Sequence, residues 1–186
     1  GVAPTGAGKT ILFSEIVGRL VKSGNARTIV IAHRDELTSQ NQEKFLRINP
    51  DIETSVFDAN TKSWDGKVTF AMVQTLSQPQ NLETIPRPDL LVIDEAHHSA
   101  AETYRRIIDH VRNINPDCRL LGLTATPNRS DGKGLREVFS NVSDQISLHE
   151  LIRSGHLVPP RTFVIDVGVR DELSNLKSRG NDFDMV

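Results

Sequence analysis

The sequence has 186 residues, of which 37% are hydrophobic and 25% are charged, and its formal net charge at pH 7 is −2. These values are typical of an ordinary globular domain; they exclude an intrinsically disordered chain and give no support to a uniformly basic nucleic-acid binder. A lone cysteine, Cys118, excludes an internal disulfide, and no run of about 18 apolar residues predicts a membrane span. We therefore expect a cytoplasmic location and no membrane partner.

Helical and extended patterns alternate along the chain. From residue 9 to 22 apolar residues recur at helical spacing, and Gly24 supplies a stop signal. Residues 28–32 form a continuous β-branched run of the kind that is buried on both faces of a parallel sheet. The other expected elements are strands at 54–57, 67–72, 90–93, 119–123 and 162–167, helices at 35–48, 102–111 and 147–153, and a proline-marked loop at 79–88. The pattern predicts an α/β fold whose open, mostly parallel sheet carries helices on both faces.

The beginning of the sequence carries the most specific motif. The spacing of a phosphate-binding loop, G-x-x-x-x-G-K-[ST], is matched apart from its first glycine by Ala3-Pro4-Thr5-Gly6-Ala7-Gly8-Lys9-Thr10. Gly6 and Gly8 allow backbone N–H groups to turn toward a phosphate, and the following helix adds the positive end of its dipole. Lys9 is predicted to reach the β- and γ-phosphates, and the Thr10 hydroxyl to ligate Mg²⁺. A glycine-rich turn that only caps a helix would need neither side chain at these positions.

Two carboxylates follow the apolar run at 90–93. Asp94 and Glu95 are therefore expected at the carboxyl edge of the sheet, where ligands of open α/β folds bind. Asp94 is predicted to hold Mg²⁺, directly or through water, and Glu95 to orient and deprotonate the attacking water. The alternative is a helix N-cap with an acidic first turn. The preceding strand and the phosphate loop favour the metal and catalytic roles.

Taken together, these motifs resemble those of superfamily 2 helicases. The phosphate loop and the run Asp94-Glu95-Ala96-His97 are similar to motifs I and II in the DEAH-type form, in which an Ala-Pro opening is common. Residues 31–37, 73–76 and 123–127 are similar, in that order, to motif Ia, to the strand-contacting motif after it, and to motif III. Further likeness at 122–135 and 151–160 narrows the resemblance to bacterial or phage RadD-like and type III restriction Res-subunit-like helicases, which act on DNA.

The resemblance implies a RecA-like P-loop NTPase domain that binds ATP and Mg²⁺ and couples ATP hydrolysis to movement of a DNA strand. It implies nucleotide contacts over residues 3–10. The residues implied in catalysis are Lys9, Asp94 and Glu95. Those implied in coupling the ATP site to the nucleic-acid site are His97, Thr124 and Thr126. Those implied in gripping the nucleic-acid backbone are His33, Arg34, Gln74 and Thr75.

The resemblance also implies a two-domain motor of which this sequence is one half. Only Val2 stands for the strand that normally precedes a phosphate loop, so the sequence is interpreted as a fragment. Residues 1–158 are expected to form an N-terminally truncated first RecA-like domain, and 159–186 a linker toward a second one. That second domain supplies the arginine fingers in the family, so the fragment alone is expected to hydrolyse ATP very poorly.

Other functions are weighed against this interpretation. The main alternative is a nucleotide-gated, DNA-binding translocation module of a restriction complex without unwinding activity. A small GTPase is disfavoured because no Asn-Lys-x-Asp motif is present, and a P-loop kinase is disfavoured by the Thr-Ala-Thr element at 124–126. Trp64 is expected to serve packing more than base stacking, and Cys118 to be a small buried or edge residue. The histidines interpreted as surface or structural residues are His98, His110, His149 and His156, while Arg129 and Lys133 could face either DNA or nucleotide.

Overall fold

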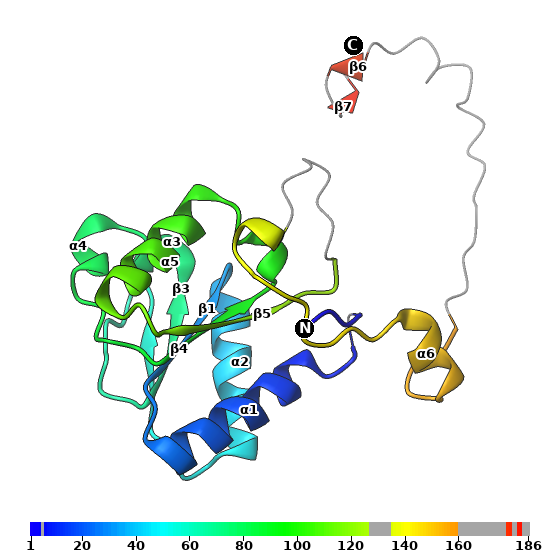
Figure 1. Ribbon diagram of the computed structural model, residues 1–186, viewed down its shortest axis with the longest axis horizontal. Coiled ribbons are helices and arrows are strands. Elements are labelled where there is room, and N and C mark those ends of the chain that lie inside the picture. The colour runs from blue at the N-terminus through cyan, green and yellow to red at the C-terminus, as the bar shows by residue number, and fades with distance from the viewer. Residues whose placement is uncertain (5, 127–134, 160–177, 180–181, 184–186) are drawn as a thin grey trace.

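A five-stranded sheet forms the centre of the structure, a computed structural model that describes residues 1–4, 6–126, 135–159, 178–179 and 182–183 (Figure 1). The strands lie in the order β2-β3-β1-β4-β5, and every neighbouring pair is parallel. Their bounds are β1 Thr28–Ala32, β2 Thr54–Phe57, β3 Val68–Met72, β4 Leu90–Asp94 and β5 Arg119–Leu123. The predicted open, parallel sheet is confirmed.

Helices cover both faces of the sheet, as the sequence predicts. On one face lie α1 (Lys9–Gly24) and α2 (Asp35–Ile48), and on the other α3 (Val73–Leu76) and α5 (Glu102–Ile114). The core under α1 and α2 includes Phe13, Val17, Val30, Phe45, Phe70 and Val92. The core under α3 and α5 includes Ile29, Ile31, Leu91, Ile93, Tyr104 and Ile107. Alternate residues of β1 and β4 thus enter different cores, because successive side chains of a strand point to opposite faces.

Short elements complete the described chain. They are α4 (Pro79–Leu82), α6 (Leu148–Arg153), two 3₁₀ helices at Ala96–His98 and Leu135–Glu137, and an antiparallel pair of β6 (Ser178–Arg179) with β7 (Asp182–Phe183). Helix α6 confirms the helix predicted at 147–153. Ser147 caps it by accepting the N–H of Glu150 at 3.2 Å, and the Glu150 carboxylate accepts the N–H of Ser147 at 2.7 Å.

Helix α1 ends at Gly24, where the sequence predicts a stop, and the left-handed conformation just beyond it (φ 55°, ψ 30°) belongs to Asn25, whose short polar side chain tolerates it. One expectation about local structure is wrong in detail. The expected loop at 79–88 begins as helix α4, because proline suits the first turn of a helix. The strand expected at 162–167 lies outside the described residues. Within the described ranges no helix is long and apolar enough to cross a membrane.

Residues 1–3 extend the sheet beyond β5. The N–H of Ala3 donates to the carbonyl of Thr124 at 2.9 Å, and the N–H of Val2 donates to the carbonyl of Asp144, also at 2.9 Å. Val2 therefore lies between the end of β5 and a segment around Gln145, with a parallel bridge to each. This short piece occupies the place of the strand that precedes a phosphate loop, as the sequence predicts.

Candidate nucleotide-binding site

The phosphate loop joins the edge of the sheet to α1 through two glycines in the left-handed region. The φ angle is 83° at Gly6 and 79° at Gly8, and residues other than glycine rarely adopt such backbone conformations. Gly8 is the N-cap residue of α1, and no side chain caps that end of the helix. Uncapped N–H groups and the helix dipole together attract anions. Residues 6–10 thus have the geometry of an anion site, while Thr5 lies outside the described residues.

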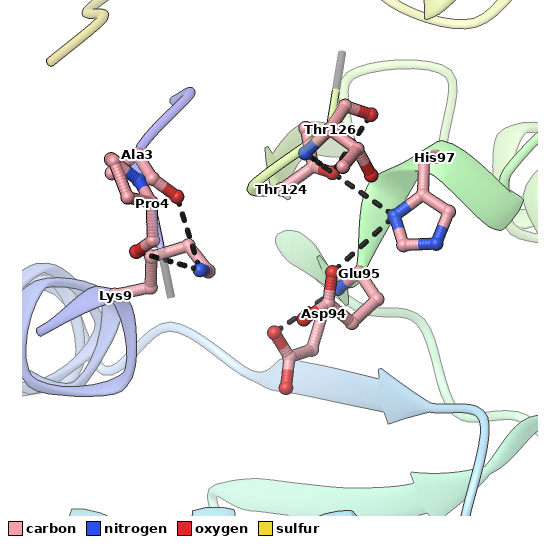
Figure 2. A network of polar contacts seen from close by, with 8 residues as sticks. All are labelled: Ala3, Pro4, Lys9, Asp94, Glu95, His97, Thr124 and Thr126. Carbon is pink, nitrogen blue, oxygen red and sulfur yellow. Dashed lines mark hydrogen bonds and ion pairs between the residues drawn. The ribbon is translucent and has the colours of Figure 1, made fainter. Parts of the chain in front are cut away.

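Lys9 is the first residue of α1, and its side chain folds back over the loop. Its Nζ donates to the carbonyl oxygen of Ala3 at 3.1 Å and to that of Pro4 at 3.2 Å (Figure 2). Both acceptors are neutral, so they orient the ammonium group without cancelling its charge. In Figure 2 this group lies on the side of the loop that faces Asp94 and Glu95.

A cavity of about 520 Å³ lies between the phosphate loop and these carboxylates. Its volume is in the range of small-molecule sites, about 300–1,000 Å³. The loop, α2 and the end of β4 all contribute to its walls. Among the lining residues are Gly6, Gly8, Lys9, Thr10, Asn41, Asp94 and Glu95. The structure therefore brings the two predicted parts of the nucleotide site to one cavity.

Asp94 ends β4 at the carboxyl edge of the sheet and is 8% exposed. Its Oδ1 accepts the N–H of Glu95 at 3.0 Å, and its Oδ2 accepts Nδ2 of Asn41 at 2.8 Å. On the far side of the same amide, the hydroxyl of Thr10 donates to Oδ1 of Asn41 at 3.4 Å. One amide thus bridges the two side chains that the sequence predicts as Mg²⁺ ligands.

The donor set at this place suits Mg²⁺. A hydroxyl and a carboxylate are hard oxygen donors, and Mg²⁺ usually takes its other ligands from substrate phosphates and water. In the part of the chain that the structure describes, no group of three or more His, Cys, Asp or Glu side chains could hold a metal ion. Thr10 and Asp94 alone would supply two ligands of such an ion.

Glu95 has a strained backbone. Its φ of 53° and ψ of 54° are left-handed, which costs a residue other than glycine about 1–2 kcal/mol. This conformation turns the chain from β4 into the 3₁₀ helix Ala96–His98. The side chain keeps 32% of its surface exposed beside the cavity. Strained backbone of this kind is concentrated at functional sites.

The three residues implied in coupling are joined through Thr124. Nδ1 of His97 lies 3.0 Å from Oγ1 of Thr124 and 3.3 Å from Oε2 of Glu95 (Figure 2). The Thr124 hydroxyl donates to the carbonyl of Thr126 at 3.2 Å and accepts the N–H of Thr126 at 3.1 Å. With the hydroxyl proton directed at Thr126, a proton on Nδ1 of His97 would satisfy both the hydroxyl and the carboxylate. A continuous polar chain thus links Glu95 to Thr126.

The residues implied in gripping nucleic acid also lie at one edge of the sheet. They follow β1 and β3, which are adjacent and parallel with Ala32 opposite Met72. Nε2 of Gln74 lies 3.1 Å from Nδ1 of His33, so the two motifs touch. Arg34 is exposed at the N-cap of α2. Thr75 belongs to the same short helix as Gln74.

His98 stands between the ATP-site residues and this edge. Its ring centroid is 4.1 Å from that of His97 and 5.0 Å from that of His33, with which it is stacked. The sequence places His98 among surface or structural residues, and the structure gives it a structural position in a row of three imidazole rings. The polar chain from Glu95 is therefore continuous in space with the His33–Gln74 contact.

Three other side chains owe their positions to packing. The ring of Trp64 lies 4.6 Å from that of Phe57, in agreement with the packing role expected for it. Cys118 is 8% exposed, and burial raises the pKa of its thiol to about 11, which keeps it protonated and unreactive. Burial also raises the pKa of Tyr104, and the nearby charge of Asp94 adds to the effect.

The sequence predicts neither the contact of Asn41 with Asp94 nor the position of His98 between His97 and His33. Asn41 lies in no motif, and its contact with Asp94 joins residues 53 apart in the sequence. The available signal was a polar residue on the buried side of a predicted helix. Pro127, at the end of the stretch similar to motif III, and Arg129 and Lys133 lie outside the described residues.

Comparisons with known proteins show which family the chain resembles. Residues 2–129 match the family described as the type III restriction enzyme, res subunit. The chain is 31% identical over 194 residues to "Putative ATP-dependent helicase IRC3" of Saccharomyces cerevisiae, covering 98% of this chain and 28% of that protein. It is 30% identical over 174 residues to "ATP-dependent DNA helicase MPH1" of Pyricularia oryzae, covering 87% of this chain and 15% of that protein.

Solved structures show the same fold. The UvsW helicase from bacteriophage T4 superposes with a TM-score of 0.61 at 18% identity, covering 73% of this chain and 49% of that chain. The predicted RecA-like fold and the resemblance to helicases are confirmed by these matches. The chain spans less than a third of the length of either curated relative.

Proposed function

Because this chain belongs to the family of the type III restriction enzyme res subunit, we propose that it is the ATP-binding half of an ATP-dependent DNA helicase or translocase. One observation carries the proposal. Lys9 and the uncapped start of α1 face Asp94 and Glu95 across a single cavity of about 520 Å³. Positive donors on one wall and carboxylates on the other are what a nucleoside triphosphate with its metal ion requires.

In this proposal the phosphate loop binds the triphosphate of ATP. The N–H groups at the start of α1 and the Lys9 ammonium group hold the phosphate oxygens, while Thr10 and Asp94 hold Mg²⁺. When bound, Mg²⁺ neutralises charge on the β- and γ-phosphate oxygens. The chain's own contribution is mainly positioning and electrostatic stabilisation.

Glu95 is proposed to orient the attacking water and accept its proton at a carboxylate oxygen. Glu95 follows Asp94 directly and so stays at the carboxyl edge of the sheet. The left-handed backbone at Glu95 gives its side chain a different direction from that of the Asp94 side chain. His97 donates to Glu95 and so holds it in place. The same histidine contacts Thr124, which is bonded to Thr126, and on its other side it approaches His33 of the nucleic-acid edge through the ring of His98. These contacts support the coupling role proposed for His97, Thr124 and Thr126.

DNA is proposed to run along the edge formed by His33, Arg34, Gln74 and Thr75, with its backbone as the main point of contact. Such contacts need no base recognition, which agrees with a net charge of −2 and an aromatic share of 5%. The name of one relative, "ATP-dependent DNA helicase MPH1", supports DNA rather than RNA as the nucleic acid that this chain binds. No contact among the described residues favours the alternative of a restriction module without unwinding activity.

The other partner in this proposal is a second RecA-like domain. Residues 159–186 are proposed to lead toward it, and its arginine fingers complete the ATP site. Arginine fingers are worth about 10³–10⁵ in turnover in related enzymes, so this chain alone is expected to hydrolyse ATP very slowly. A cytoplasmic location is proposed on the ground of its single, buried cysteine.

ATP binding is tested with Lys9→Ala. We expect the affinity for Mg-ATP, measured by titration calorimetry, to fall about tenfold to hundredfold, because a charged hydrogen-bond donor to the phosphates is lost. Lys22→Ala removes an exposed lysine from the last turn of the same helix and should leave the affinity unchanged. Equal affinities for the wild type and Lys9→Ala would show that the phosphate loop is assigned wrongly.

The nucleic-acid edge is tested with the double variant Arg34→Ala, Gln74→Ala. In filter binding to single-stranded DNA, we expect weak, sequence-independent binding that falls with salt, and about tenfold weaker binding of the double variant at low salt. Loss of one phosphate contact should lower the salt slope by about 0.7. Arg19→Ala, which removes an exposed arginine of α1, is the charge-matched control. If the double variant binds as tightly as the wild type at every salt concentration, the DNA lies elsewhere on the domain.

A further inference from the structure

Helix α2 carries a polar residue on its buried side. Thr38, Asn41 and Phe45 recur at helical spacing and are 3%, 3% and 0% exposed. Phe45 belongs to the apolar core under α1 and α2, so this side of the helix faces the sheet. A buried amide is costly unless its donors and acceptor are paired. An apolar residue at position 41 would pack against the sheet without needing hydrogen-bond partners, whereas the Asn41 amide needs them.

Both ends of the Asn41 amide are paired within the nucleotide site. A carboxylate only accepts hydrogen bonds, so the group that faces Oδ2 of Asp94 at 2.8 Å is the amide NH₂. The amide oxygen then faces the opposite way, where it accepts the hydroxyl of Thr10 at 3.4 Å. The two contacts require one and the same orientation of the amide. They join α2 to β4 and to the first turn of α1.

We infer that Asn41 is a positioning residue for the Mg²⁺ that accompanies ATP, an inference that rests on the proposed function. Its NH₂ group fixes Oδ2 of Asp94, while Oδ1 accepts the N–H of Glu95 at 3.0 Å and keeps a further lone pair. Its oxygen fixes the direction of the Thr10 hydroxyl, whose lone pairs are then available to a metal ion. Without the amide both groups gain freedom: the Asp94 carboxylate keeps only its hydrogen bond from the N–H of Glu95, and the threonine hydroxyl is free to bond to its own helix.

The effect of Asn41 should be confined to the metal-bound nucleotide. The phosphates themselves are held by Lys9 and by backbone N–H groups, none of which has Asn41 as its hydrogen-bond partner. Groups that orient metal ligands without touching the metal typically change metal affinity about tenfold to hundredfold. A residue that only supports the fold would weaken binding with and without the metal alike.

The test is titration calorimetry of ATP into the purified chain, once with excess Mg²⁺ and once with EDTA. For Asn41→Ala we expect the affinity in Mg²⁺ to fall about tenfold or more, and the affinity in EDTA to change less than twofold. Asn41→Leu, which keeps most of the side-chain volume, should behave in the same way and serves if the alanine variant does not fold. Thermal unfolding of each variant without nucleotide shows whether it is folded.

Asn49→Ala is the matched control. Asn49 is also 3% exposed at the end of α2, and its Nδ2 donates to the carbonyl of Ser14 at 2.9 Å, away from the cavity. This variant should lose stability and keep the wild-type ratio of the two affinities. Unchanged affinity in Mg²⁺, or equal loss in both media, for folded Asn41 variants overturns the inference. Failure of the proposed function is distinguishable, because then the wild type itself binds no ATP or does not respond to Mg²⁺.

Discussion

Replacing Glu95 by glutamine in the full-length protein is expected to lower ATP turnover by about 10²–10⁴, while the affinity for Mg-ATP stays within twofold. Glutamine has the shape of glutamate but cannot accept a proton from water. The amide keeps a carbonyl oxygen for the His97 contact at 3.3 Å, so the surroundings should not rearrange. The phosphates are held by other residues, and binding is therefore spared. Phosphate release and calorimetry measure the two quantities separately.

The control for this variant is Glu102→Gln. Glu102 is an exposed residue in the first turn of α5, paired with Arg106, and its charge lies outside the cavity. Its replacement should leave both turnover and affinity unchanged. A parallel fall of turnover and affinity in Glu95→Gln would identify Glu95 as a structural carboxylate.

Gly66→Ala is expected to remove about 3 kcal/mol from the free energy of unfolding, near the upper end of the cost of overpacking. Gly66 is buried between β2 and β3. A Cβ atom there would lie 2.5 Å from the backbone nitrogen of Ser55 and 2.5 Å from the carbonyl carbon of Thr54. Backbone atoms of a strand cannot move aside as a flexible side chain can, so β2 must shift. Urea denaturation monitored by circular dichroism measures the loss.

Gly24→Ala provides the comparison. A Cβ atom at Gly24 meets nothing within 4 Å, and the residue is the last of α1. Alanine is favoured over glycine in helices, so this variant should be equally stable or up to about 1 kcal/mol more stable. Similar stabilities of the two variants would mean that the sheet edge at Gly66 accommodates a side chain.

The sequence predicts the sheet and both halves of the nucleotide site because their signals are local. Buried parallel strands are continuous apolar runs, and the phosphate loop needs glycines at fixed offsets from Lys9. The position of Asp94 at the carboxyl edge of the sheet can be predicted because Asp94 comes directly after an apolar run. Even the meeting of His33 with Gln74 could be expected, because both follow strands of one parallel sheet.

Contacts between helix faces and the sheet could not be predicted in this way. Asn41 reaches Asp94 only because α2 packs over the neighbouring strand, and no local pattern specifies that rotation. The left-handed backbone of Glu95 could not be predicted from the sequence either, since glutamate has no preference for this conformation. The stacking of His98 depends on two turns that follow different strands.

The pairing of residues 1–3 has a consequence for how the domain folds during synthesis. Ala3 is bonded to Thr124, far along the sequence, and Val2 pairs with the segment around Gln145, which is made still later. The loop that leads into α1 is therefore made well before the segments that anchor it. Contacts over such long separations form slowly, and a domain generally folds as a unit. A nascent chain should thus become able to bind nucleotide only after the segment around Gln145 has left the ribosome, however early its glycine-rich loop was translated.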